Sequence, residues 1–162
     1  MNIFTREQWG ADEEYAYRDS TYWKEKIEKW QKNAEKPLTD AQKKAQEKAA
    51  NLSKEKIKYI NTYFAKENTT TETIDSKEGR PLAWPIKKSD YVNAIVIHHT
   101  HSEYDDSYEG IKDIYKYHSL SKSWGDIGYN YIIGYDGEIF EGRQGGYYVV
   151  AAHSVWNNIS TV

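Results

Sequence analysis

The pattern of hydrophobic and polar positions changes character near the middle of the chain. Between residues 19 and 68, Lys, Glu, Ala and Gln predominate and no glycine occurs, which favours helix. Trp23, Ile27 and Trp30 are spaced by four and then three residues, so they predict one apolar stripe along a helix. Pro37 marks the end of this helix because proline cannot continue it.

A second helix is predicted to begin at Thr39, which matches a capping box together with Gln42. Its first half is nearly all polar, and the apolar residues on one face belong to its later half: Leu52, Ile57, Ile60, Tyr63 and Phe64. We therefore expect a helical hairpin that projects from the domain and packs on it only in part. The polar, turn-rich segment 67–81 is predicted to be a linker back to the main body.

After Pro85 the pattern predicts strands and one further helix. Residues 91–97 form a short, β-branched and nearly continuous apolar run, which is typical of a strand buried on both faces. A hairpin is predicted around residues 135–137, and an apolar strand over residues 146–154. The segment between the first strand and the hairpin is predicted to be a helix, with one face made of Ile111, Ile114, Tyr115 and His118. The fold class predicted is α/β, with a mixed central β-sheet flanked by helices.

Composition limits the size of the protein and the classes of partner. A chain of 162 residues with 38% hydrophobic content can bury one core, so we expect a single domain. The chain has no cysteine, which excludes a disulfide framework and a thiolate-rich zinc site built from this chain alone. The net charge of −3 and the lack of a basic cluster argue against a nucleic-acid partner.

The remaining composition concerns membranes and aromatic surfaces. No apolar stretch approaches the roughly 20 residues of a membrane span, and the N-terminus lacks the features of a signal peptide. An export signal, if the protein uses one, is expected outside this chain. The 15 tyrosines and six tryptophans provide rigid surface suited to stacking on sugars or peptides, although most should fill core and hairpin faces.

Histidines supply the candidate chemistry. Three of the five lie at the end of the predicted strand, and alternation along a strand would put His99 and His101 on one face and His98 on the other. His118 lies on an apolar helix face and His153 ends another apolar run, so four histidines could meet at one sheet edge. Such a cluster suits zinc, whose catalytic sites use three protein ligands and a water. The alternative is a set of solvated or structurally bonded histidines.

Other catalytic chemistries have weaker support. There is no H-E-x-x-H zinc motif, no G-x-S-x-G nucleophile elbow and no G-x-x-x-x-G-K-[ST] phosphate loop. A glycosidase with two carboxylates is conceivable from the number of acids, but no pair is distinguished by its surroundings.

Five motifs in a fixed order resemble a known family. FTREQWGADE, IVIHHT, YKYH, WGDIGYNYIIGYDGEIFEGR and AAHSVWNN together resemble the zinc-dependent N-acetylmuramoyl-L-alanine amidases, which share a fold with peptidoglycan recognition proteins. The resemblance covers residues 3–14 and about 84–161. It implies one amidase-like domain over residues 1–162 that lacks its C-terminal part, with residues 17–80 as an inserted helical hairpin and linker.

The resemblance also implies roles for particular residues. His98 would be a zinc ligand, which overrules the geometric preference for its neighbours, and the remaining Zn²⁺ ligands are expected beyond residue 162. Tyr129 would be catalytic, with its phenol hydrogen-bonded to the scissile carbonyl or the metal-bound water. The substrate-binding residues would be His99, His118, Trp124 and His153. In the family a tryptophan at position 124 goes with diaminopimelate-type stems, although Ser123 stands where glycine is usual.

Each implied role has a structural alternative. Trp124 would then be a core residue, and His118 a buried histidine whose hydrogen bonds are satisfied. Asp126 would cap a turn. Arg143 would be a structural partner of Glu141 or of a backbone carbonyl.

The function predicted on this basis is hydrolysis of peptidoglycan at the amide between N-acetylmuramic acid and L-alanine, by zinc-activated water. The alternatives are a recognition module that binds muropeptides without cutting them, and an inactive fragment that needs a C-terminal partner segment. A complementing chain or a homodimer through an exposed sheet edge is a possible protein partner. We expect an extracytoplasmic location, in the cell envelope or secreted, or a role as a phage lysin.

Overall fold

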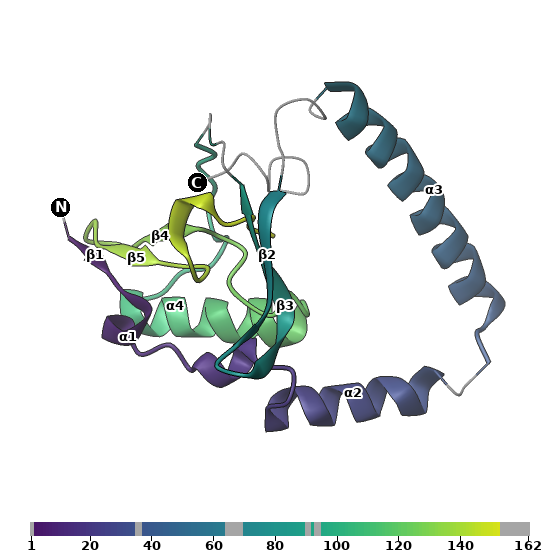
Figure 1. The fold of residues 1–162 in the computed structure, drawn as a ribbon, viewed down its shortest axis with the longest axis horizontal. Coiled ribbons are helices and arrows are strands. Elements are labelled where there is room, and N and C mark those ends of the chain that lie inside the picture. The colour runs from purple at the N-terminus through teal and green to yellow at the C-terminus, as the bar shows by residue number, and fades with distance from the viewer. Residues whose placement is uncertain (1, 35–36, 64–69, 90–91, 93–94, 153–162) are drawn as a thin grey trace.

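Two separate β-sheets organise the fold, in a computed structural model that describes residues 2–34, 37–63, 70–89, 92 and 95–152. The first has three strands in the order β1-β5-β4: β1 (Ile3–Phe4) runs parallel to β5 (Ile139–Glu141), and β4 (Tyr131–Ile133) pairs antiparallel with β5. The second is an antiparallel pair of β2 (Thr70–Lys77) and β3 (Arg80–Ser89). Helices lie beside both sheets (Figure 1), so the predicted mixed α/β class is confirmed.

The main core lies between the three-stranded sheet and two helices. α1 (Arg6–Trp9) begins with a capping box at Thr5 and ends at Gly10, whose φ of 76° suits glycine. α4 (Ser107–Lys116) begins at Asp106, whose side chain accepts hydrogen bonds from two backbone N–H groups of the first turn. The buried residues that pack together here are Trp9, Ile111, Ile114, Tyr115, Ile127 and Phe140. The helix predicted from the apolar face within 107–120 is therefore confirmed.

The predicted pair of helices is also present. α2 (Thr21–Ala34) joins the body through Trp23, which is buried and donates a hydrogen bond from Nε1 to the carbonyl oxygen of Tyr15 at 2.7 Å. α3 (Asp40–Tyr63) begins with the predicted capping box, because Thr39 N–H donates to Gln42 Oε1 at 2.9 Å and Gln42 N–H donates to Thr39 Oγ1 at 3.3 Å. Figure 1 shows α3 standing away from the sheets. The boundary of an insertion at residues 17–80 stays a prediction.

The segment expected to be a linker is instead part of a hairpin. β2 and β3 are joined at Glu78 and Gly79, whose φ angles are 54° and 75°. Positive φ at both central residues is the geometry of a type I′ turn, which matches the twist of two antiparallel strands. The hairpin takes part in a second small core, in which Ala16, Tyr17 and Leu82 are buried and Ile74 and Ile86 pack against them. The linker prediction for residues 70–77 was therefore wrong.

Two other predicted strands are not observed. Within the described part of segment 91–97, residues 92 and 95–97 form no strand, and Ile95 and Ile97 are 74% and 89% exposed. An apolar run becomes a buried strand only where neighbouring strands pair with it. In the segment 146–154, the described residues form a short 3-10 helix, η3 (Gly146–Tyr148), and an irregular continuation.

Side-chain hydrogen bonds take the place of a strand ladder in that continuation. Asn130 Nδ2 donates to the carbonyl oxygens of Gly146 at 3.0 Å and Val149 at 2.7 Å. One isolated bridge joins Val149 to Lys88 of β3. The strand prediction was wrong here because the hydrophobic pattern does not reveal that the Asn130 side chain, and not a neighbouring strand, is the hydrogen-bond partner of these backbone carbonyls.

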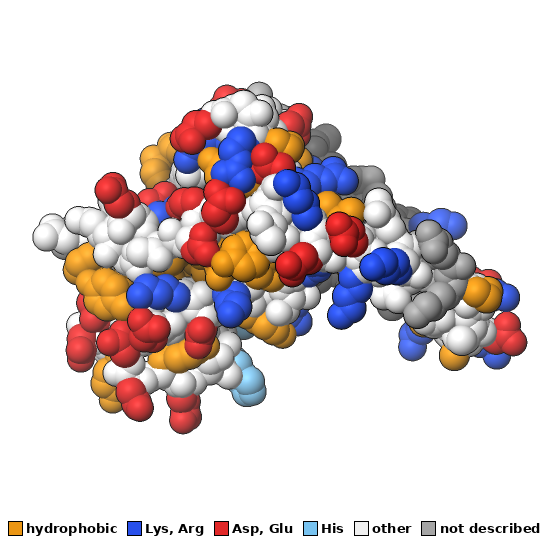
Figure 2. All heavy atoms as spheres, turned by 90° about the horizontal axis from the view of Figure 1, so that it is seen from below, with side chains coloured by type: hydrophobic (Ala, Val, Ile, Leu, Met, Phe, Trp, Pro, Cys, Tyr) orange, Lys and Arg blue, Asp and Glu red, His pale blue; other side chains and the backbone are white. Residues whose placement is uncertain are grey.

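The surface is mixed in charge. Figure 2 shows Lys and Arg side chains interspersed with Asp and Glu over the face that it draws, with hydrophobic side chains between them. None of the helices that the structure describes is long and apolar enough to cross a lipid bilayer.

Candidate functional site

Four ring-bearing residues singled out from the sequence lie together in the fold. The ring centroids of His118 and Trp124 are 4.8 Å apart, those of His118 and Tyr129 are 5.4 Å apart, and those of His98 and Tyr129 are 6.2 Å apart. We refer to these four residues as the aromatic cluster. His118 and Tyr129 each contact two of the others, so they form the middle of the cluster, with Trp124 and His98 at its ends.

His118 is placed by the end of α4. The helix continues into a π-helical turn, η2 (Tyr117–Ser121), a wider geometry that is often found at functional sites. His118 is buried, and its Nδ1 accepts a hydrogen bond from the backbone N–H of Gly128 at 3.1 Å. An accepting Nδ1 carries no proton, so the proton of the neutral imidazole is assigned to Nε2. The hydrogen bond therefore fixes both the tautomer and the orientation of the ring.

Asp126 holds the loop that carries two members of the aromatic cluster. Its Oδ1 accepts hydrogen bonds from the backbone N–H of Ile127 at 2.7 Å and from Arg6 Nη1 at 2.8 Å, and its Oδ2 accepts one from the backbone N–H of Gln144 at 2.9 Å. The carboxylate thus has the turn-stabilising role that the sequence allowed. Its ion pair with Arg6 was not predicted.

Arg143, which follows β5, supports the same loop from the neighbouring strand of the hairpin. Its guanidinium donates to the carbonyl oxygens of Ile127 at 2.8 Å and Trp124 at 3.3 Å, and the side chain is buried. Its backbone N–H donates to the carbonyl oxygen of Tyr129 at 2.8 Å. Of the two structural alternatives for Arg143, the one that pairs it with backbone carbonyls is confirmed.

Two buried arginines lie beneath the loop, and Arg6 is paired with carboxylates. Burial alone lowers the pKa of the Arg6 guanidinium, but the carboxylates of Asp126 and Glu13 outweigh it and hold that pKa above its usual range. Arg6 Nε lies 2.7 Å from Glu13 Oε1, and Arg6 also donates to the carbonyl oxygen of Gly142. Burial lowers the pKa of Arg143, partly offset by Asp126. These contacts stabilise the loop. Loss of Arg6 or of Asp126 would leave the other as a buried charge without its partner.

The hydroxyl of Tyr129 is suited to donate a hydrogen bond over a wide pH range. The side chain is half-buried, and this desolvation raises its pKa above the ordinary value of 10.0. The phenol is therefore protonated at neutral and mildly alkaline pH. A protonated phenol can donate to a carbonyl oxygen that gains negative charge during hydrolysis.

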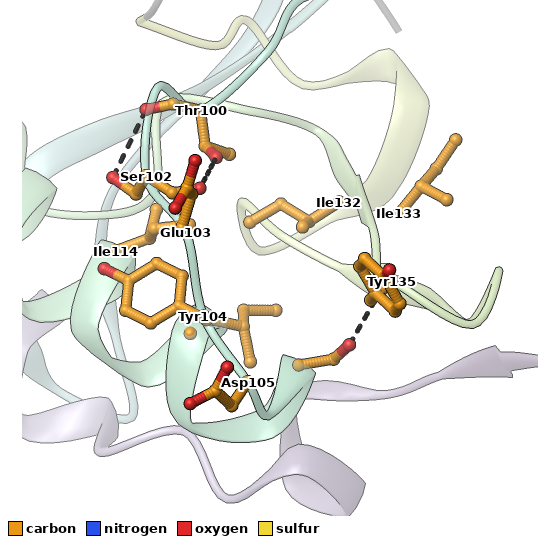
Figure 3. Close-up of a pocket in the computed structure, with 13 residues that line it drawn as sticks. Thr100, Ser102, Glu103, Tyr104, Asp105, Ile114, Ile132, Ile133 and Tyr135 are labelled. Carbon is orange, nitrogen blue, oxygen red and sulfur yellow. Dashed lines mark hydrogen bonds between the residues drawn. The ribbon is translucent and has the colours of Figure 1, made fainter.

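One large cavity is separate from the aromatic cluster. It has a volume of about 860 Å³ and lies between the loop that precedes α4 and the strand β4 (Figure 3). Figure 3 shows Glu103, Tyr104 and Asp105 on one wall, and Ile132 and Tyr135 facing them from the other. No member of the aromatic cluster lines this cavity. It lies instead beside β4, an edge strand of its sheet.

Sequence comparisons connect this site to known proteins. Over 96 residues the chain is 40% identical to peptidoglycan-recognition protein SC2 of Drosophila simulans, and the match covers 54% of this chain and 51% of that protein. This chain is a homologue of the peptidoglycan-recognition proteins. It spans about half the length of these Drosophila relatives. Human N-acetylmuramoyl-L-alanine amidase is 31% identical over 70 residues, which cover 40% of this chain and 12% of that protein.

Structural and family comparisons add less. Wild-type Drosophila PGRP-LB matches 42% of this chain and 42% of its own, with 33% identity and a TM-score of 0.38. No protein-family model matches the chain. The relation to peptidoglycan-recognition proteins therefore stands on the sequence matches.

Zinc was the cofactor predicted for this peptidoglycan-recognition homologue. Among the residues that the structure describes, no group of three or more His, Cys, Asp or Glu side chains could hold a metal ion. His98 is exposed and borders Tyr129, and the described residues alone do not form a zinc site. We assign no catalytic step to zinc on this structure.

The histidines other than His118 divide into one contacting group and one residue that the structure does not describe. The rings of His98 and His99 stack with centroids 5.2 Å apart, and His99 contacts His101 at 5.4 Å. Because residues 98–101 form no strand and His101 has a φ of 58°, the premise that His99 and His101 share a strand face was wrong. His153 lies outside the described residues. The substrate-binding roles of His99 and His153 and the metal-ligand role of His98 stay predictions.

Sequence reasoning missed the residues beneath the site. Arg6, Glu13 and Gly142 hold the loop but were assigned no role. Arg6 and Glu13 lie in the motif FTREQWGADE, where an arginine just inside a capped helix was the available signal. Their partner Asp126 is 120 residues away from Arg6, a distance that no local pattern spans.

Proposed function

We propose that the aromatic cluster binds muropeptides, the peptide-bearing sugar fragments of peptidoglycan. The observation that carries this proposal is the contact of His118 with both Trp124 and Tyr129, next to a loop held by a buried ion pair. Rigid aromatic and imidazole groups offer apolar area together with fixed hydrogen-bonding atoms, and they lose little entropy on binding. The names of the homologous proteins, which specify peptidoglycan recognition and N-acetylmuramoyl-L-alanine amidase, support the same ligand class.

Hydrolysis is the finer part of the proposal. The bond cleaved would be the amide between N-acetylmuramic acid and L-alanine, with Zn²⁺ supplying an activated water when bound. His98 would provide one ligand, and the remaining ligands would come from outside the described residues. Tyr129 would donate a hydrogen bond to the scissile carbonyl oxygen, where a single such donor is typically worth about 3 kcal/mol in the transition state.

A calorimetric titration of the chain with a muramyl tetrapeptide tests the binding part. Trp124→Ala should weaken binding by roughly tenfold, the equivalent of about 1.4 kcal/mol, because it removes a ring that contacts His118. Tyr135→Ala is the matched control, since Tyr135 is 91% exposed and lies outside the cluster. Equal affinities for the wild type and Trp124→Ala would contradict the proposal.

Mass spectrometry of the same mixture with added zinc tests the hydrolytic part. Wild type should release a peptide with a new alanine amino terminus, and Tyr129→Phe should bind the muropeptide while releasing far less peptide. If the wild type bound the muropeptide without releasing peptide, the chain would act as a recognition module. Removing zinc with a chelator would then leave its affinity for the muropeptide unchanged. If Tyr129→Phe released as much peptide as the wild type, the Tyr129 hydroxyl would have no role in the hydrolysis.

The proposal includes a partner and a location. Ile95 and Ile97 are exposed. Among the described strands β4 pairs on one side only, its Ile133 is exposed, and it borders the cavity of about 860 Å³, so this sheet edge offers an apolar surface. A complementing chain or a second copy of this one would cover that surface. Peptidoglycan as ligand implies an extracytoplasmic site of action, in the envelope, after secretion or as a lysin.

A further inference from the structure

A second groove lies between α2 and β3 and is lined by two half-exposed tryptophans. Its volume is about 490 Å³. Trp30 of α2 is 46% exposed and Trp84 of β3 is 45% exposed. We call this feature the indole groove. Indole rings of this kind present flat apolar faces to solvent, and large exposed apolar groups that border one pocket mark an interaction site.

The walls of the indole groove are held in place from below. Trp23 forms its floor, is buried, and meets Trp30 edge to face at a centroid distance of 6.1 Å. Lys26 Nζ lies 5.3 Å from the Trp23 ring and 5.2 Å from the Trp30 ring, so one cation fixes both indoles. A ligand that stacks on such a wall meets a surface that is already ordered.

Trp84 is fixed by a close backbone approach. A Cβ atom at Gly125 would lie 2.7 Å from Trp84 Cβ and 2.9 Å from its backbone nitrogen, so only glycine lets the loop come this near. The φ of Gly125 is 66°, which also favours glycine. The loop that supports the aromatic cluster therefore also supports one wall of the indole groove.

Polar atoms at the rim complement the rings. Arg18, Gln31 and Ser123 line the groove. Within the part of the chain that the structure describes, the Arg18 guanidinium makes no ion pair or side-chain hydrogen bond, so its donors are open to a ligand. Ser123 has a φ of 61°, a conformation uncommon for a non-glycine residue, and it brings a hydroxyl to the rim.

This lining fits a sugar better than a peptide strand or a nucleic acid. β3 pairs with β2 on one edge, and bridges from Leu82 to Tyr17 and from Lys88 to Val149 engage its other edge. Little sheet edge is therefore open for an added peptide strand. A nucleic-acid strand needs several cations along its phosphates, whereas Arg18 is the one arginine or lysine lining the groove. A pyranose ring has apolar C–H faces for the indoles and hydroxyls for the rim.

We propose that the indole groove binds N-acetylhexosamine units of a glycan. The choice of the peptidoglycan glycan rests on the proposed function: Ser123 at the rim is followed directly by Trp124 of the aromatic cluster, so a polymer with its peptide stem at the cluster presents its sugars to the groove. The helix α2 would in this way extend the binding surface from the peptide to the glycan.

The test uses a peptide-free tetramer of N-acetylglucosamine, added to the whole chain and followed by calorimetry and tryptophan fluorescence. Wild type should bind with a Kd on the order of 1 mM or tighter. Trp30→Ala and Trp84→Ala should each weaken binding by roughly tenfold. Trp84→Phe should restore part of the affinity because it returns an aromatic face. Tyr135→Ala should bind as the wild type does, and thermal melts should show each variant folded.

The outcomes separate this inference from the proposed function. Loss of tetramer binding in the Trp30 and Trp84 variants, with stem-peptide binding unchanged, supports a distinct glycan site even if the Trp124→Ala result contradicts the muropeptide proposal. No binding of the tetramer by wild type, or unchanged affinity in both folded variants, overturns the inference. Trp30-dependent binding of a single-stranded oligonucleotide without binding of the tetramer overturns it as well.

Discussion

Tyr115 shows how strongly one position depends on its surroundings. The side chain is 1% exposed, and the Arg6 guanidinium lies 4.6 Å above its ring. Its hydroxyl is buried and finds no hydrogen-bond partner among the described residues. Burial is the main cause that raises the pKa of this phenol, the carboxylate of Asp126 adds to the effect, and Arg6 opposes it.

Tyr115→Phe should therefore alter stability at alkaline pH. The unfolded tyrosine ionises near pH 10, whereas the folded one ionises higher, so the free energy of unfolding of the wild type falls as pH rises above about 10. The variant lacks this loss and should gain up to about 1.4 kcal/mol on the wild type at pH 11. At pH 7 the two should agree within about 1 kcal/mol. Urea unfolding at both pH values measures this.

Tyr135→Phe is the control for the alkaline experiment. Tyr135 is 91% exposed, so its hydroxyl is in water in the folded and unfolded chain alike, and the variant should follow the wild type at both pH values. A Tyr115→Phe protein that loses stability between pH 7 and pH 11 as steeply as the wild type would contradict the argument.

Single residues were predictable from sequence where a motif was local. His98, His118, Trp124 and Tyr129 were all named from short motifs, and the structure brings their rings together. Arg6 was not, because its role depends on a partner distant in the sequence. The burial of a charged side chain can be recognised only when the positions of the residue and of its partner in the fold are both known.

At the scale of elements, the site depends on the segment that follows β5. The backbone N–H of Gly142 donates to the carbonyl oxygen of Asn130 at 2.9 Å. A Cβ atom at Gly142 would collide with the carbonyl oxygen of Tyr129 and would lie 3.1 Å from that of Asn130. The loop that carries Tyr129 therefore packs against a position that has no room for a side chain.

Gly142→Ala should destabilise the protein by about 2–3 kcal/mol, because the backbone at Tyr129 must move. Gly137→Ala is the matched control: Gly137 has a φ of 84° but no atom within 4 Å of an added Cβ, so only the conformational cost of about 1–2 kcal/mol applies. Urea unfolding measures both. If the two variants lost the same stability and kept the same muropeptide affinity, the close contact would not support the site.

Elements were predictable where their hydrogen bonds are internal or adjacent in sequence. The helix that includes Ile111 and Ile114 and the hairpin around residues 135–137 were both correct. The strand expected over 91–97 was wrong for its described residues because an apolar run does not specify its pairing partner. The hairpin of β2 and β3 was missed, although Glu78 and Gly79 between polar and β-branched residues were a usable turn signal.

For the whole molecule, the notable feature is the edge of the three-stranded sheet at β4, where no further strand among the described residues pairs. β4 is an edge strand, Ile133 on it is 70% exposed, and the large cavity lies beside it. β4 is short, which limits pairing with another chain, but it carries no charged side chain that would oppose such pairing. The mixed sheet class was predictable from the order of elements, whereas this open edge follows from pairing and was only inferred.

The chain should therefore self-associate as its concentration rises, and Ile133→Lys should reduce that association by placing a charge on the edge. Sedimentation velocity over a concentration series measures this. Leu38→Lys is the control, because it adds the same charge at an exposed position between α2 and α3 that does not line the cavity beside β4. A wild type that sediments as a monomer throughout the series would contradict a partner surface at β4.

The ion pair between Arg6 and Asp126 also bears on the order in which parts of the chain fold. The two residues are separated by 120 positions, so during synthesis the Arg6 guanidinium stays in water until the loop around Asp126 has left the ribosome. The helices α2 and α3 rely on near neighbours and form early, whereas closure over so long a separation is slow. The aromatic cluster is consequently among the last parts of the protein to reach its final arrangement.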